Sequence, residues 1–134
     1  MNRMIVVLGA AFCVAVMAAG CSSSKEEGVT SSYRSQWTMV GADTRTTTEA
    51  ARAVLEEQGL KEIKADSTMV DGTAEGRKAD GTEIKVSIKK KGEGASEITT
   101  TVGALGSPTL GAEITRKIAD RAQKAADARP AGAR

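Results

Sequence analysis

Residues 80–90, DGTEIKVSIKK, decide the fold expected for this chain. Asp80-Gly81 is typical of a two-residue β-hairpin turn, because both residue types tolerate the positive φ angles that such turns require. From Glu83 to Lys89 apolar and polar residues alternate, which predicts a strand with one buried face and one wet face. The stretch therefore indicates an antiparallel sheet that is covered on one side only.

Strand-like sequence continues on both sides of this hairpin. The first strand, residues 36–41, places Trp37 and Met39 on one face and Thr38 and Val40 on the other. Three further segments have the spacing of strands: residues 60–68, 73–78 and 96–103. Together with residues 82–90 they predict a sheet of five strands.

Two helices are expected to cover this sheet. In residues 46–59, Thr46 and Glu49 form a capping-box pattern, and Gly59 suits the left-handed position that follows a last turn. The second helix has Ser107 as its N-cap and Pro108 at its first position, where the missing N–H costs nothing. Its apolar stripe consists of Leu110, Ile114, Ile118, Ala122 and Ala125. The order β-α-β-β-β-β-α predicts an α+β fold with both helices on one face of a single antiparallel sheet.

The N-terminus has the three parts of a secretory signal peptide. Arg3 supplies a positive charge, an uncharged run of 15 residues (5–19) follows, and small residues lead up to Cys21. Because a helix needs about 20 apolar residues to span a bilayer, this run is too short for a permanent transmembrane helix.

Cys21 adds a more specific prediction. Residues 18–21, Ala-Ala-Gly-Cys, resemble the lipobox of bacterial lipoproteins, whose usual form is Leu-(Ala/Ser)-(Gly/Ala)-Cys, with Ala18 in place of the common Leu. The resemblance implies cleavage before Cys21, a diacylglyceryl group on its sulfur, and acylation of the new amine, with palmitate as the expected acyl group. Several chains together anchor a domain stably. The alternative is an ordinary signal peptide in which Cys21 has no such role.

These patterns divide the chain into four parts. Residues 1–20 are assigned to a cleaved signal peptide, 21–34 to the lipidated cysteine and a flexible linker, 35–126 to one folded domain, and 127–134 to a disordered tail. The linker is small and charged without apolar periodicity, and the tail is rich in Ala, Gly, Pro and Arg. Cleavage before Cys21 removes 20 of the 134 residues and leaves 114.

A second resemblance covers residues 35–122. A Leu-x-x-x-Gly-Leu helix end (55–60), an Asp-Gly hairpin, and Val-Gly-Ala-Leu-Gly (102–106) before an Ile-rich helix are similar to a family of small bacterial lipoproteins. That family is catalogued only as a domain of unknown function, and its commoner pattern has Asp where this chain has Ser107. The resemblance implies the fold and the anchor, but no activity.

The composition excludes several kinds of chemistry. The chain has no His, and its two cysteines, Cys13 and Cys21, are removed with the signal peptide or consumed by lipid. The common nucleophile–base pairs, redox sites and thiolate metal sites are therefore not expected. Glu56 and Glu57 diverge on a helix, and Asp71 precedes a turn glycine. We expect no catalytic residue, no metal site, no cofactor and no enzymatic activity.

Two surface features are candidates for partner contacts. Lys89, Lys90 and Lys91 form the densest positive cluster, which either contacts anionic headgroups or is simply a solvated strand end. Trp37 is the only tryptophan; it either packs in or beside the core or contacts a partner. Overall, 19 Lys and Arg against 17 Asp and Glu lack the clustered basic excess of a nucleic-acid binder.

The sequence favours a non-enzymatic lipoprotein of the bacterial cell envelope. Its domain would face the periplasm, held at the membrane through Cys21, and would offer its wet sheet face or a groove beside a helix to another envelope protein. Ser22 behind the cysteine favours the outer over the inner membrane. The alternative is a binder or carrier of a small apolar, lipid-like ligand between helices and sheet.

Overall fold

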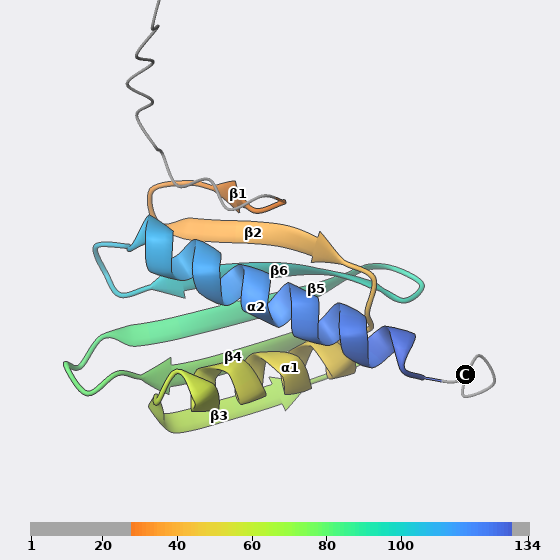
Figure 1. The fold of residues 1–134 in the computed structure, drawn as a ribbon, viewed down its shortest axis with the longest axis horizontal. Helices are drawn as coiled ribbons and strands as arrows, with labels where there is room; N and C mark the ends of the chain where they lie inside the picture. The colour runs from red at the N-terminus through yellow and green to blue at the C-terminus, as the bar shows by residue number, and fades with distance from the viewer. Residues whose placement is uncertain (1–27, 130–134) are drawn as a thin grey trace, which may run out of the picture.

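A computed structural model describes residues 28–129 of the chain. The strands are β1 (Thr30–Ser31), β2 (Ser35–Val40), β3 (Lys61–Ser67), β4 (Asp71–Arg77), β5 (Glu83–Gly92) and β6 (Ala95–Val102). They form one antiparallel sheet in the order β1-β2-β6-β5-β4-β3. The helices α1 (Thr44–Glu57) and α2 (Pro108–Asp127) both lie on one face of it (Figure 1). The predicted α+β fold and its element order are confirmed, with β1 as a short addition.

The strand predicted from residues 80–90 occupies the middle of the sheet. In β5, Ile84, Val86 and Ile88 are fully buried beneath the helices. The turn before it is longer than the predicted two residues, because residues 78–82 connect β4 to β5. The carboxylate of Asp80 accepts a hydrogen bond from the Thr82 N–H at 2.8 Å, which stabilises a turn in which Asp80 keeps a negative φ.

Helix α1 begins earlier than predicted. Asp43, not Thr46, is the N-cap, and its carboxylate accepts a hydrogen bond from the Thr46 N–H at 2.7 Å. The predicted capping box is therefore wrong. The end agrees with expectation, since Gly59 has a φ of +73° and Leu60 N–H donates to the Leu55 carbonyl at 3.1 Å. This is the hydrogen-bond pattern of a Schellman motif, which satisfies the last carbonyls of a helix.

Helix α2 begins at Pro108 after Ser107, as predicted, although the Ser107 side chain makes no capping hydrogen bond. Ile114, Ile118 and Ala122 are fully buried. The stripe continues with the half-buried Ala126 and not with Ala125, because steps of four residues stay on the same side of a helix.

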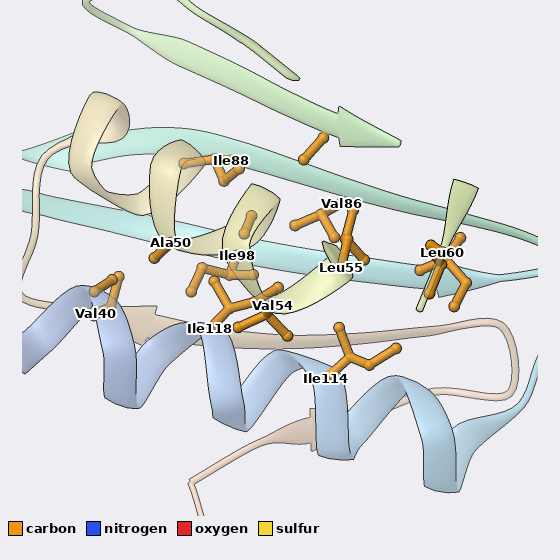
Figure 2. Packing of buried hydrophobic residues seen from close by; sticks show 14 of the residues in the cluster. Val40, Ala50, Val54, Leu55, Leu60, Val86, Ile88, Ile98, Ile114 and Ile118 are labelled. Atoms are coloured by element: carbon orange, nitrogen blue, oxygen red, sulfur yellow. The ribbon is translucent and has the colours of Figure 1, made fainter. Parts of the chain in front are cut away.

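The core lies between the sheet and the two helices. Figure 2 shows Val54 of α1 and Ile114 and Ile118 of α2 meeting above Val86 and Ile98 of the sheet. Each of these side chains is at most 1% exposed. The space between helices and sheet is thus filled by the protein's own side chains.

Two glycines let the helices approach the sheet closely. A Cβ atom added at Gly72 of β4 would collide with Oγ1 of Thr48 in α1. One added at Gly111 of α2 would collide with Oε1 of Gln36 in β2. Each helix therefore has one contact where only glycine fits.

The described chain extends beyond residues 35–126 on both sides. Residues 30 and 31, expected in the linker, form β1 on the outer edge of β2, and Thr38 Oγ1 donates to the Gly28 carbonyl at 2.6 Å. Helix α2 ends at Asp127, and Arg129 pairs with Asp43 at 2.7 Å. The signal peptide, Cys21 and residues 130–134 lie outside the described residues.

Candidate functional site

The face of the sheet opposite the helices carries the only tryptophan. Along β2, Gln36 and Val40 are buried beneath the helices, whereas Trp37 and Met39 lie on the open face. Trp37 is half-buried among its neighbours on the sheet, and Met39 is exposed. Trp37 and Met39 share a face as predicted, and it is the face that the helices leave uncovered.

A row of hydroxyl groups crosses the open face beside Trp37. Trp37 is opposite Thr99 of β6, which is opposite Ser87 of β5, which is opposite Thr73 of β4. None of these side chains is charged. Apart from Trp37, the side chains of this row are short and polar.

Ion pairs flank this uncharged row on the open face. Lys85 pairs with Glu75 at 2.5 Å on one side, and Lys91 pairs with Glu97 at 3.3 Å on the other. The hydrogen bond and charge of Glu75 raise the pKa of Lys85, so this lysine is charged throughout the neutral range. The open face therefore has an uncharged centre and a rim of opposite charges that largely compensate each other.

The three lysines at 89–91 do not form one patch. Lys89 lies on the open face opposite Asp71 and Glu97, whereas Lys90 continues the helix-facing side of β5. Lys91 is held by its ion pair with Glu97. Strand β6 separates all three from Trp37, so the sequence-predicted contact residues are not brought together.

One end of the sheet, which we call the Leu105 end, is formed by residues 78–82 and 103–107 with the start of α2 (Figure 1, left). It contains an open cleft of about 930 Å³ whose lining includes Val102, Leu105 and Leu110. Leu105 is 80% exposed. The Val-Gly-Ala-Leu-Gly motif thus forms a loop at the mouth of a cleft, with Gly106 against the Tyr33 backbone.

The opposite end, which we call the Met69 end, is formed by residues 68–70 and 92–94 with the start of α1 and the end of α2. Thr68 Oγ1 accepts hydrogen bonds from the N–H groups of Val70 and Asp71, which closes a tight turn. Met69 and Val70 project from this turn and are 87% and 62% exposed. Neither residue is among the contact residues predicted from the sequence, although an apolar pair between Thr68 and Asp71 is unusual in a turn.

Asp43, the N-cap residue of α1, also lies at the Met69 end. Partial burial raises the pKa of Asp43, but the stronger combined effect of hydrogen bonds from Thr46 and the charge of Arg129 lowers it below its ordinary value. The ionised Asp43 carboxylate therefore links the start of α1 to Arg129, which follows the end of α2.

Within residues 28–129, no group of three or more Cys, Asp or Glu side chains is placed to hold a metal ion. None of the helices over that same range combines the length and apolar character needed to cross a membrane. No protein-family model matches the sequence, and no curated protein is significantly similar to it.

Proposed function

We propose that this chain is a lipoprotein of the bacterial envelope, anchored through Cys21, whose domain binds another envelope protein on its open sheet face. The lipobox-like residues 18–21 support the anchor. The position of Trp37 on the uncovered face supports the binding role. In this proposal the protein performs no reaction of its own.

The position of Trp37 on the uncovered face of the sheet is the main support for the binding role. The centres of protein interfaces are enriched in aromatic residues and Met and depleted in charge, while their rims are polar. The open face repeats this arrangement, with Trp37 and Met39 beside uncharged hydroxyls and the pairs Lys85–Glu75 and Lys91–Glu97 around them. A tryptophan in such a position is a typical binding hot spot.

The experiment maps contacts from the anchored protein in cells. A photo-crosslinking residue is placed at Met39 or Thr99 on the open face, and a matched one at Arg52 on the exposed side of α1. We expect one and the same protein to be crosslinked from positions 39 and 99 but not from 52. Capture of that protein equally from position 52 would contradict a specific site.

The identified partner is then purified and its affinity measured. Trp37→Ala is expected to weaken binding by about 30-fold or more, because truncation of a hot spot costs at least about 2 kcal/mol. Leu105→Ala, at an exposed site away from the open face, serves as the control and should leave the affinity unchanged. An unchanged affinity for Trp37→Ala would rule out the open face as the interface.

The anchor is tested separately. Wild-type cells should incorporate labelled fatty acid into the protein and retain it in the membrane fraction, whereas Cys21→Ser should abolish both. Identical fractionation of the two, with no label in either, would remove the lipoprotein assignment.

A second candidate function rests on the cleft at the Leu105 end. Its volume of about 930 Å³ lies within the usual range for small-ligand sites, and Val102, Leu105 and Leu110 contribute apolar surface. An apolar ligand would bind there and not between helices and sheet, where Ile98, Ile114 and Ile118 fill the space. Release of a stoichiometric lipid-like molecule from the denatured wild type, and its loss in Leu105→Asp, would favour this function.

A further inference from the structure

We infer that the Met69 end of the domain faces the bilayer, with Met69 and Val70 inserted among the phospholipid headgroups around the anchor. The inference rests on the proposed lipidation of Cys21. It adds an orientation and a second membrane contact, made by the folded domain itself.

The chain enters the folded domain alongside β2. In β1, Thr30 is opposite Trp37 and Ser31 is opposite Gln36, so the chain runs antiparallel to β2. Gly28 is therefore further along β2, where its carbonyl accepts the hydrogen bond from Thr38. Strand β2 runs from the Leu105 end to the Met69 end (Figure 1). Because Gly28 lies beside Thr38 in the second half of β2, the chain enters on the half of β2 nearer Met69.

The segment between Cys21 and Gly28, which we call the tether, limits how far the domain can lie from the membrane. Seven residue steps separate Cys21 from Gly28, which allows a reach of about 25 Å when fully extended. A flexible chain of this length has a typical end-to-end distance of only about 15 Å. To bring the Leu105 end to the membrane, the tether would first run back three residue steps from Thr38 to Ser35, about 10 Å at the rise of a strand. The tether therefore favours contact at the Met69 end.

Met69 and Val70 are neighbours at the tip of a closed turn and have no place in the core. The Lys90 N–H donates to the Val70 carbonyl at 2.8 Å. Lys90 and Arg45 line the same cleft as Met69, with Arg45 also paired with Glu49 at 3.3 Å. An apolar tip with basic side chains beside it suits a membrane surface, where apolar groups insert and cations meet lipid phosphates.

Acidic groups at the same end are largely compensated within the protein. Asp43 pairs with Arg129 and Glu97 pairs with Lys91. Asp71 keeps its charge although Thr68 donates a hydrogen bond to it, and so does Glu93; Lys89, opposite Asp71 in the sheet, and Lys90 offset these two charges. The end is thus close to neutral. The apolar tip, rather than a strong positive field, provides the membrane contact.

The Leu105 end supplies the matched control. Leu105 and Tyr33 are 80% and 76% exposed, much as Met69 and Val70 are. By exposure alone, either end could therefore insert into lipid. The entry point of the tether, and not the exposure of apolar side chains, favours the Met69 end. A measurement that compares the two ends in one lipidated protein therefore tests the orientation itself.

The experiment uses the full-length lipidated protein, reconstituted in vesicles of phosphatidylethanolamine and phosphatidylglycerol. Met69→Cys and Leu105→Cys are each labelled with an environment-sensitive fluorophore, since acylated Cys21 offers no competing thiol. We expect a blue shift, and quenching by lipids with a nitroxide at the headgroup, at position 69 and neither change at position 105. Val70→Cys repeats the measurement at the same tip.

The outcomes separate the orientation from the anchor. If the protein floats with the vesicles but quenching is equal at both ends, stronger at position 105, or absent from both, the orientation is wrong and the anchor stands. A protein that neither carries fatty acid nor floats overturns both proposals. If the fluorophore at position 69 shows its blue shift only when envelope proteins are added, this tip contacts a protein. That result would also overturn the inference.

Discussion

The Met69 end and the Leu105 end expose apolar side chains to a similar extent, but they are held in different ways. The Met69 end is braced by contacts between distant segments: Arg129 with Asp43, the Gln123 side chain with the Gly41 N–H at 3.1 Å, and Lys90 with Val70. At the Leu105 end, three turn glycines with positive φ angles shape the loops: Gly81, Gly103 and Gly106, at +88°, +59° and +80°. Gly106 also packs against the Tyr33 backbone.

This difference shows how one small sheet can perform two tasks. The contacts between distant segments fix the Met69 end, so in the proposed orientation that end would keep its shape on contact with lipid. Turn glycines set the other end locally and leave an open cleft there. Exposure of apolar residues does not distinguish the ends, whereas the tether and the bracing do.

The largest effect is expected for the core that both ends share. Ile118→Ala should lower the free energy of unfolding by about 2–5 kcal/mol, because it leaves a cavity in a fully packed site. Urea denaturation followed by Trp37 fluorescence measures the change, with the exposed Lys124→Ala as control.

The same variant tests whether the ends belong to one cooperative unit. The amides of Lys90 and Gly103 donate hydrogen bonds at the Met69 end and the Leu105 end respectively. Hydrogen exchange should show the same loss of protection at both amides. Loss at one end alone would mean that the two ends unfold independently.

The next largest effect concerns the close approach of each helix. Gly72→Ala should cost about 1–3 kcal/mol of unfolding free energy, because its Cβ would meet Thr48 in a packed contact. Gly111→Ala should cost less, since alanine regains up to about 1 kcal/mol of helix propensity. Chemical denaturation measures both, and addition of Thr48→Ala should relieve part of the Gly72→Ala penalty. Strict additivity of those two changes would contradict the contact.

The sequence could predict most of this fold because alternation and turn residues act locally. The pattern of residues 80–90 sets the buried side of β5, and Gly59 sets the end of α1. The sequence predicts the start of α1 at Thr46 because Thr46 and Glu49 match the pattern of a capping box. Only the structure shows that the Asp43 carboxylate bonds the Thr46 N–H.

The candidate surfaces depend on tertiary contacts that no local pattern contains. Strand β1 has two residues and exists only because β2 offers it an edge. Alternation places Trp37 and Gln36 on opposite faces, but does not say which face the helices cover. Gln36 is buried because Gly111 of α2 leaves room for its side chain.

The smallest effect is expected from pH, and it concerns the Met69 end. Asp43 has a lowered pKa in the folded protein, so its ionised form adds stability above the unfolded-state pKa of about 4. That contribution is lost as pH falls through the folded-state pKa. Between about pH 5 and about pH 3 the unfolding free energy should therefore fall more steeply in wild type than in Asp43→Asn. Equal slopes in urea titrations would show that Asp43 adds no acid-sensitive stability.

The two outer strands of the sheet also bear on how neighbouring copies behave. An edge strand with free N–H and C=O groups invites pairing with another molecule. Here β1 occupies part of the β2 edge, and β3 is interrupted by a bulge between Lys61 and Lys64, with Glu62 at a φ of +54°. Molecules confined to one membrane surface collide often and side by side. In the proposed anchored state, the segment that contains β1 would therefore also limit sheet-to-sheet aggregation among crowded copies.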